Sequence, residues 1–168
     1  KRTIKKYLPE YNSKIVLKNT SIKLFNSKSD LTLESKGLIK TKDNFDNFKI
    51  KEKYNYINKK FDISGTLGLT NSKIKISKLN YNKDYGEESE IDFNINFILN
   101  KSYSINKLNF LAGENKILLS NVRLNKNFEL DDLKKLEVRT FVKGLKNNDF
   151  SINKNKKIVI SGEVFDAE

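Results

Sequence analysis

The sequence contains no cysteine, histidine, tryptophan or methionine, and only one proline among its 168 residues. Without cysteine, the chain has no disulfides, no thiolate nucleophile and no cysteine-based metal site. Without histidine, it has no imidazole ligand and no Ser-His-Asp or Cys-His catalytic arrangement. The P-loop spacing and a calcium loop of the EF-hand type are also missing. These absences predict a protein that is not an enzyme and that holds no cofactor.

Long apolar runs are missing as well. No stretch of about 18 apolar residues could cross a bilayer as a helix, and no signal-peptide pattern opens the chain. Because the chain begins at Lys1 rather than at methionine, we expect a fragment or a processed product of a longer protein. Residues 1–12 are basic and contain Pro9, and are expected to form a lead-in or edge segment. Residues 13–168 are expected to form one domain.

The charge is strongly unbalanced, with 33 basic against 21 acidic residues and a net charge of +12. Arginine occurs only at positions 2, 123 and 139. Proteins that read bases favour the bidentate geometry of arginine. A diffuse lysine surface fits non-specific attraction to an anionic partner, either nucleic acid or anionic lipid headgroups. An ordinary solvated surface is the simpler interpretation.

The clearest positive signal is strict alternation in the stretch SEIDFNINFIL, residues 89–99. Five apolar residues fall on the odd positions 91, 93, 95, 97 and 99, and Asp92, Asn94 and Asn96 fall on even positions between them. Successive side chains of a strand point to opposite faces, so this stretch predicts a strand with one apolar and one polar face.

Similar short runs recur every 8 to 15 residues or so, separated by Asn- and Gly-rich turn signals. The sequence therefore predicts an all-β fold, an antiparallel meander of about ten to twelve strands that forms a curved, one-sided apolar sheet or groove. A closed β-sandwich is the alternative. Only FELDDLKKL, residues 128–136, has the pattern of a short helix, and a strand–loop–strand interpretation fits it nearly as well.

An apolar sheet face must be covered by something. The sheet can close on itself as a sandwich or barrel, or the face can stay open and be covered by lipid chains. Gly65 and Gly162 share the apolar side of their strands, which indicates a bend or a close approach at each. On the residues alone, a self-buried core is the simpler interpretation.

The last thirty residues resemble the central β-rich region of AsmA-like, YhdP-type bacterial envelope proteins. The resemblance extends with some specificity over about residues 60–168, and the run KKFDISGTLGLTNSKIKISKLNY is similar in style to the same group. The matching positions are an arginine at the end of a strand, an Asn-Asp pair, a short strand and a final apolar strand with glycine and Asp-Ala: Arg139, Asn148, Asp149, Phe150 to Ile152, Ile158, Ile160, Gly162, Phe165, Asp166 and Ala167.

The resemblance implies a segment of a periplasmic bridge-like lipid-transport protein that conducts phospholipid between inner and outer membranes. It also implies an inner-membrane anchor outside this segment, and outer-membrane or envelope proteins as possible partners. In that interpretation acyl chains bind the apolar face. The residues expected to line it are Phe61, Ile63, Leu67, Leu69, Ile91, Phe93, Ile95, Phe97, Leu99, Ile158, Ile160 and Val164.

Three other candidate features receive plainer interpretations. Acidic clusters at positions 87, 88 and 90 and at 131 and 132 are taken as solvated turns rather than as a catalytic carboxylate pair. Arg139 is expected to pair with a neighbouring glutamate rather than with a headgroup phosphate. Nucleic acid is an unlikely partner, although five tyrosines could stack on bases if they were exposed among the lysines: Tyr54, Tyr56, Tyr81, Tyr85 and Tyr103.

Overall fold

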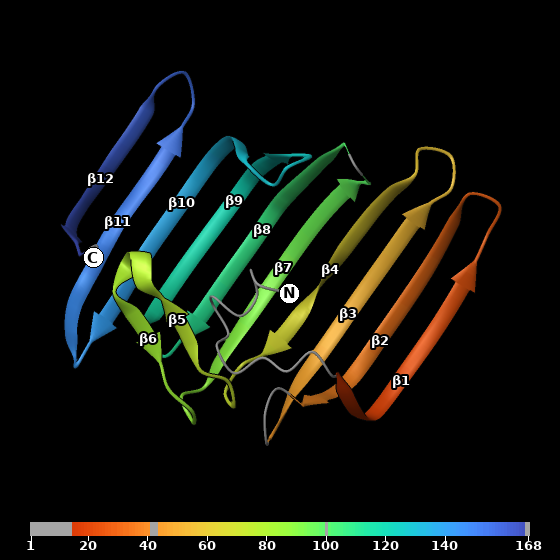
Figure 1. The fold of residues 1–168 in the computed structure, drawn as a ribbon, viewed down its shortest axis with the longest axis horizontal. Helices are drawn as coiled ribbons and strands as arrows, with labels where there is room; N and C mark the ends of the chain where they lie inside the picture. The colour runs from red at the N-terminus through yellow and green to blue at the C-terminus, as the bar shows by residue number, and fades with distance from the viewer. Residues whose placement is uncertain (1–14, 41–43, 100, 167–168) are drawn as a thin grey trace.

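The computed structural model of the protein describes residues 15–40, 44–99 and 101–166, so the expected lead-in at 1–12 lies outside the described residues. Ten strands form one open antiparallel sheet, as Figure 1 shows. This confirms the predicted meander, and the described residues contain no second large sheet that would close a sandwich. In spatial order the ten strands are β1 (Val16–Asn26), β2 (Asp30–Lys40), β3 (Phe45–Asn55), β4 (Lys60–Gly68), β7 (Ser89–Ile98), β8 (Ser102–Ala112), β9 (Asn115–Asn125), β10 (Leu130–Val142), β11 (Leu145–Lys154) and β12 (Ile158–Phe165).

One excursion interrupts the meander between β4 and β7. It contains β5 (Ile74–Ile76), the one-turn 3₁₀ helix η1 (Ser77–Leu79) and β6 (Tyr81–Lys83), and we call it the hairpin. Sequence alternation predicted a further strand of the meander here. Instead, the Leu69 amide donates to the Ser89 carbonyl and brings β4 directly beside β7. Asn80 then reverses the chain in the left-handed conformation, with φ of 43°.

The segment 128–136 is not helical, because β10 begins at Leu130. A tight turn precedes it, in which the Asn125 side-chain oxygen accepts hydrogen bonds from the amides of Asn127 and Glu129. Phe128 takes a positive φ of 63° in this turn. Leu136 then pairs with Leu119 of β9. Cross-strand apolar pairing therefore outweighs the weak helical spacing of this short segment.

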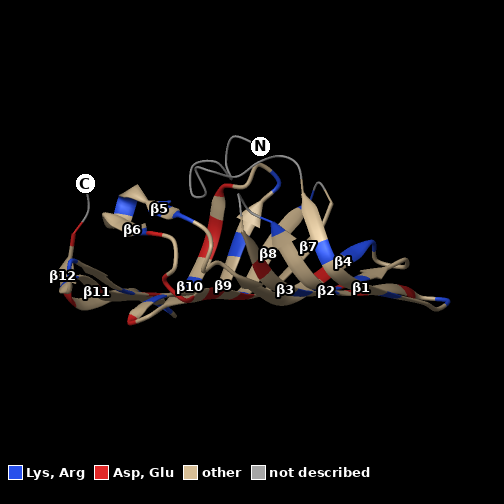
Figure 2. Ribbon diagram, turned by 90° about the horizontal axis from the view of Figure 1, so that it is seen from below, with Lys and Arg blue, Asp and Glu red and all other residues tan. Residues whose placement is uncertain are grey.

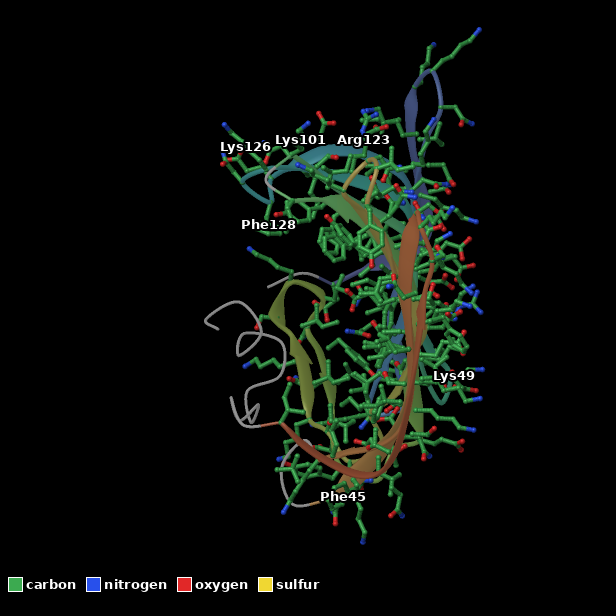
Figure 3. All side chains as sticks on the ribbon, turned by 90° about the vertical axis from the view of Figure 1, so that its right-hand side faces the viewer. Phe45, Lys49, Lys101, Arg123, Lys126 and Phe128 are labelled. Atoms are coloured by element: carbon green, nitrogen blue, oxygen red, sulfur yellow. The ribbon has the colours of Figure 1, made fainter. Side chains whose placement is uncertain are left out.

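The two faces of the sheet differ sharply in chemistry. Because paired residues in neighbouring antiparallel strands share a face, the strand register sorts every side chain to one side. The register row of Phe48, Leu67, Ile91, Phe110 and Ile117 is apolar throughout. The sheet is curved, and the hairpin lies on its concave side (Figures 2 and 3). Lys49 projects outward from the opposite, convex side (Figure 3).

The convex face is a set of cross-strand ion pairs. Lys51 contacts Glu34 at 2.8 Å, and Lys116 contacts Glu137 at 3.0 Å. A hydrogen bond from Lys51 lowers the pKa of Glu34, and hydrogen bonds from Lys135 and Lys116 lower that of Glu137. Exposed pairs of this kind are worth only about 0–1 kcal/mol each. Their main effect is to keep one side of a single-layer sheet soluble.

Candidate functional site

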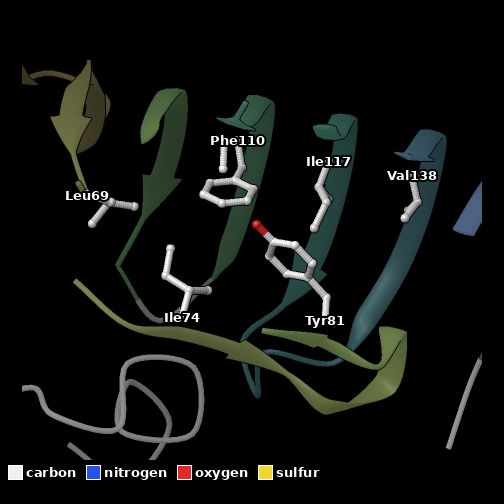
Figure 4. Close-up of a cluster of buried hydrophobic side chains, with 7 residues drawn as sticks. Leu69, Ile74, Tyr81, Phe110, Ile117 and Val138 are labelled. Carbon is white, nitrogen blue, oxygen red and sulfur yellow. The ribbon is translucent and has the colours of Figure 1, made fainter. Parts of the chain in front are cut away.

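The concave face begins, at one end of the strands, with a row of side chains that the hairpin covers. Figure 4 shows Ile74 and Tyr81 of the hairpin facing Phe110, Ile117 and Val138 of the sheet. These five side chains are buried, Tyr81 with 1% and Val138 with 2% of its surface exposed. This covered row is the compact core among the described residues.

Lys83 ties the base of the hairpin together. Its buried Nζ atom donates to the carbonyl of Ser72 at 2.9 Å and to that of Asp84 at 2.8 Å. Loss of hydration lowers the pKa of this ammonium group, an effect that nearby carboxylates partly oppose. Burial disfavours the charged form of Tyr81 as well, which for a hydroxyl group raises the pKa. Both groups lie within the packing of the hairpin against the sheet.

A polar clasp holds the far end of the hairpin to β10 and β11. The side-chain amide of Asn148 donates to the Leu79 carbonyl at 2.7 Å and to the Thr140 hydroxyl at 2.8 Å. Asn80 donates to the Asp166 carboxylate at 3.0 Å, and the Asp166 amide donates to Asn148. Asn148 and Asp166, two of the positions on which the resemblance to AsmA-like proteins rests, therefore fasten the hairpin. Ala167 of that motif lies outside the described residues.

We expect Asn148→Ala to lower the free energy of unfolding by about 1–3 kcal/mol, because it strips partners from buried polar groups. Hydrogen exchange should speed up most in residues 74–83. Asn153→Ala is the matched control, since Asn153 lies outside the clasp on the same strand and its side chain donates to the neighbouring Ser151 hydroxyl. Equal losses in the two variants would contradict the role of the clasp.

Beyond the hairpin, two rows of mostly apolar side chains cross the sheet from β3 to β12, and we call them the open rows. Ile95 pairs with Ile63 on one side and with Ile105 on the other, and Phe93 pairs with Leu108. No second sheet packs on these rows in the described part of the chain. Most of their side chains are only half-buried. Taken across the sheet they are Ile50, Gly65, Phe93, Leu108, Leu119, Leu136, Ile152 and Ile160, and then Glu52, Ile63, Ile95, Ile105, Val122, Leu133, Lys154 and Ile158.

The last row of the concave face is aromatic. The rings follow one another across β3, β4, β7, β8 and the β9–β10 turn, with centroid separations of 4.4 to 5.8 Å. Phe61 and Phe97 stack almost in parallel, at an interplanar angle of 10°. In order, this aromatic row contains Tyr56, Tyr54, Phe61, Phe97, Tyr103 and Phe128.

Most of the predicted apolar residues do share the concave face, but two do not belong to it. Leu99 follows the end of β7 and lies exposed in the β7–β8 turn. Val164 pairs with Asp149, because the register shifts near Gly162, and this places Val164 on the convex face. Phe165 takes its place on the concave face and contacts Phe150 at 4.9 Å between centroids.

The structure also corrects several smaller predictions. Arg139 contacts Asp149 at 3.7 Å rather than a glutamate. Asp132 lies within β10 and binds Lys154 at 2.7 Å, so it is not a turn residue. Tyr81 is a core residue, which removes it as a stacking platform.

Sequence reasoning missed most of the open rows, although the signal was present. Leu119, Leu133 and Leu136 lie in runs that alternate over only a few residues. Asn121 has a positive φ of 51°, and this local irregularity of β9 leaves Val122, the partner of Ile105, on the concave face out of phase with Leu119. The aromatic row is invisible to alternation alone, since its members lie far apart in the sequence and meet through strand pairing.

No helix among the described residues is long and apolar enough to cross a membrane. The described residues also contain no cluster of three or more acidic side chains suited to a metal ion. Comparison of the chain with family models, curated proteins and solved structures found no match to any of the three.

Proposed function

We propose that the protein carries phospholipid acyl chains on its concave face, as one segment of a bridge-like lipid-transport protein. The observation that carries this proposal is the pair of open rows. They form a largely apolar surface across eight strands, from β3 to β12, with charged residues only at Glu52 and Lys154 and with no second sheet over them in the described residues. Contiguous exposed apolar surfaces of this size mark binding sites.

The dimensions of the surface fit lipid chains. Neighbouring strands lie about 4.8 Å apart, so the seven intervals between the eight strands of the open rows span about 34 Å. This exceeds the roughly 30 Å hydrocarbon core of a bilayer. An acyl chain can therefore lie across the strands along its whole length, and each buried methylene contributes about 0.8 kcal/mol.

Movement along such a surface needs no chemistry. A chain that slides from one strand to the next leaves one apolar contact and gains an equivalent one, so no large energetic step opposes it. The resemblance to AsmA-like proteins extends the proposal to a periplasmic location, with an inner-membrane anchor outside this segment and the outer membrane as the destination of the lipid.

Native mass spectrometry with lipid extraction tests the proposal. The purified protein should carry phospholipid, and the double variant Ile95→Asp with Ile105→Asp should lose at least nine-tenths of it. These two half-buried residues face each other in an open row, so a pair of carboxylates there disrupts the apolar surface. Asn94→Asp is the matched control, because Asn94 lies on the convex face of the same strand.

Circular dichroism should show that the double variant keeps its strands. A wild-type protein that carries no phospholipid, and that takes up no fluorescent phospholipid from vesicles, would contradict the proposal. So would a double variant that retains its lipid. In that case the protein is better described as a basic β-structured binding or structural module.

A further inference from the structure

The turns at the aromatic end of the strands carry more lysines without an ion-pair partner than the described connections at the opposite end. Five turns lie at this end, and they join β1 to β2, β3 to β4, β7 to β8, β9 to β10, and β11 to β12. Together they contain six lysines and a single acidic residue, Glu129. We call this end the basic edge, and its lysines are Lys28, Lys59, Lys101, Lys126, Lys156 and Lys157.

All six lysines are exposed, and none forms an ion pair with another described residue. Many lysines of the convex face differ in this respect, as Lys51, Lys107 and Lys116 do with their carboxylate partners. The opposite end of the sheet is nearly balanced, since its described connections contain five lysines, Lys73, Lys75, Lys78, Lys83 and Lys143, against four acidic residues, Asp84, Glu87, Glu88 and Glu114. The excess of positive charge is therefore directional.

Three turns of the basic edge also present a large apolar side chain to solvent. Ile57 is 82% exposed in the β3–β4 turn, Leu99 is 57% exposed in the β7–β8 turn, and Phe128 is 65% exposed in the β9–β10 turn. Each of these turns contains one of the lysines as well. Figure 3 shows Phe128 with Lys101 and Lys126 where the sheet curls at this end.

We propose that the basic edge docks on the surface of an anionic phospholipid bilayer. An anionic surface attracts the unpaired lysines, whose apolar stems can lie along the interface while the ammonium groups stay hydrated. The exposed side chains of Ile57, Leu99 and Phe128, which we call the apolar tips, can enter the headgroup region of the bilayer. The aromatic row next to them can lie at the same depth, because aromatic side chains favour the membrane–water interface. This docking does not depend on acyl chains occupying the concave face.

Nucleic acid is the other polyanion that lysines attract, and the structure favours it less. Binding of single strands uses free aromatic faces on which bases stack. Here Phe61 and Phe97 stack on each other, and Tyr103 stacks on Phe128 at 4.4 Å. Two of the three exposed tips, Ile57 and Leu99, are aliphatic and offer no face for stacking.

Vesicle flotation tests the docking. The wild-type protein should float with vesicles of phosphatidylcholine containing 30% phosphatidylglycerol, and not with phosphatidylcholine alone. The triple variant Lys59→Gln, Lys101→Gln and Lys126→Gln should weaken partitioning on the order of a hundredfold, as expected for three lysines near an anionic surface. The tip variant Ile57→Ser, Leu99→Ser and Phe128→Ser should weaken it as well.

The matched control changes the same number of charges elsewhere. Lys23, Lys36 and Lys49 are exposed on the convex face, and their replacement by glutamine should leave binding within about threefold. An equal loss in this control would overturn the proposal in favour of unspecific charge attraction. The proposal would also be overturned, in favour of nucleic acid, if the protein bound a thymidine 20-mer as tightly as it binds vesicles and the tip variant kept that affinity. The Ile95→Asp, Ile105→Asp variant should still dock, which separates this test from that of acyl-chain binding.

Discussion

Replacement of Tyr81 by alanine is expected to lower the free energy of unfolding by about 3–5 kcal/mol, the usual cost of removing a large buried aromatic side chain. Tyr81 is almost fully buried between the hairpin and the sheet, and its ring lies 6.0 Å from that of Phe110. A single-layer sheet has little other compact core. The cavity left by alanine would therefore undock the hairpin and expose the covered row.

The hydroxyl of Tyr81 provides a sensitive control. It is buried and has no hydrogen-bond partner among the described residues. Tyr81→Phe removes this unsatisfied polar group and keeps the ring, so we expect it to leave stability unchanged or to raise it by as much as about 1 kcal/mol. Tyr81→Ala should therefore lower the free energy of unfolding strongly, whereas Tyr81→Phe should leave it unchanged or raise it slightly.

Urea unfolding followed by circular dichroism measures both changes, and hydrogen exchange locates them. Protection in residues 74–83 should fall in Tyr81→Ala and persist in Tyr81→Phe. If Tyr81→Phe were as destabilising as Tyr81→Ala, the hydroxyl would have a partner that the structure does not show, and the packing argument would be wrong. If neither variant affected stability, the hairpin would not be docked on the sheet in solution.

The sheet itself could be predicted from the sequence, because alternation reports directly on a one-sided sheet. In β7, every second residue from Ile91 to Phe97 is apolar, and the residues between them are polar. Turn signals supplied the order of the strands, since each short turn joins neighbours in the sheet. The open state of the apolar face was one of two alternatives, and the chain alone did not decide between them.

The hairpin could not be predicted in the same way. Its strands have only three residues each, and Ile74 and Ile76 alternate with lysines as in any strand of the sheet. What separates them is the Leu69–Ser89 hydrogen bond at the base of the excursion, a contact between residues 20 positions apart. Local pattern carries no information about such a contact.

The error at Val164 has a similar cause. A strict period of two assigned it to the apolar side together with Ile158 and Ile160. One register shift beside Gly162 reversed the faces for the final residues of β12. Because a one-residue slip moves every later side chain to the other face, single irregularities limit any assignment of faces from alternation.

The sequence predicted a bend or a close approach of the backbone at Gly65 and Gly162, and the structure shows a close approach at both. Gly65 is not placed to widen a groove, because a Cβ atom there would lie 2.1 Å from the Lys49 carbonyl oxygen and 3.0 Å from the Ile50 Cα atom. The close approach of β3 to β4 is therefore possible only without a side chain. We expect Gly65→Ala to lower the free energy of unfolding by about 3 kcal/mol, since backbone atoms rather than a flexible side chain must move.

Gly68→Ala is the matched control on the same strand, because its nearest neighbours would lie at 3.3 Å and a small shift accommodates them. We expect it to cost less than about 1 kcal/mol. Gly162→Ala adds a second comparison, since its Cβ would meet the Asp149 carbonyl at 2.4 Å but at the edge strand β12. Urea unfolding ranks the three variants, and equal losses for Gly65 and Gly68 would contradict the close approach.

The position of each glycine should decide how far the damage extends. Each strand of a single-layer sheet is stabilised mainly by its two neighbours, as in a one-dimensional array. A break between β3 and β4 leaves β1–β3 joined to the excursion mainly by the hydrogen bonds from Asn71 to Phe45 and Asp46, so in Gly65→Ala hydrogen exchange should accelerate most in β1, β2 and β3. In Gly162→Ala the acceleration should stay within β11 and β12. If Gly65→Ala instead loosened every strand equally, the sheet would unfold as one cooperative unit, and the apolar face could not open or close in parts.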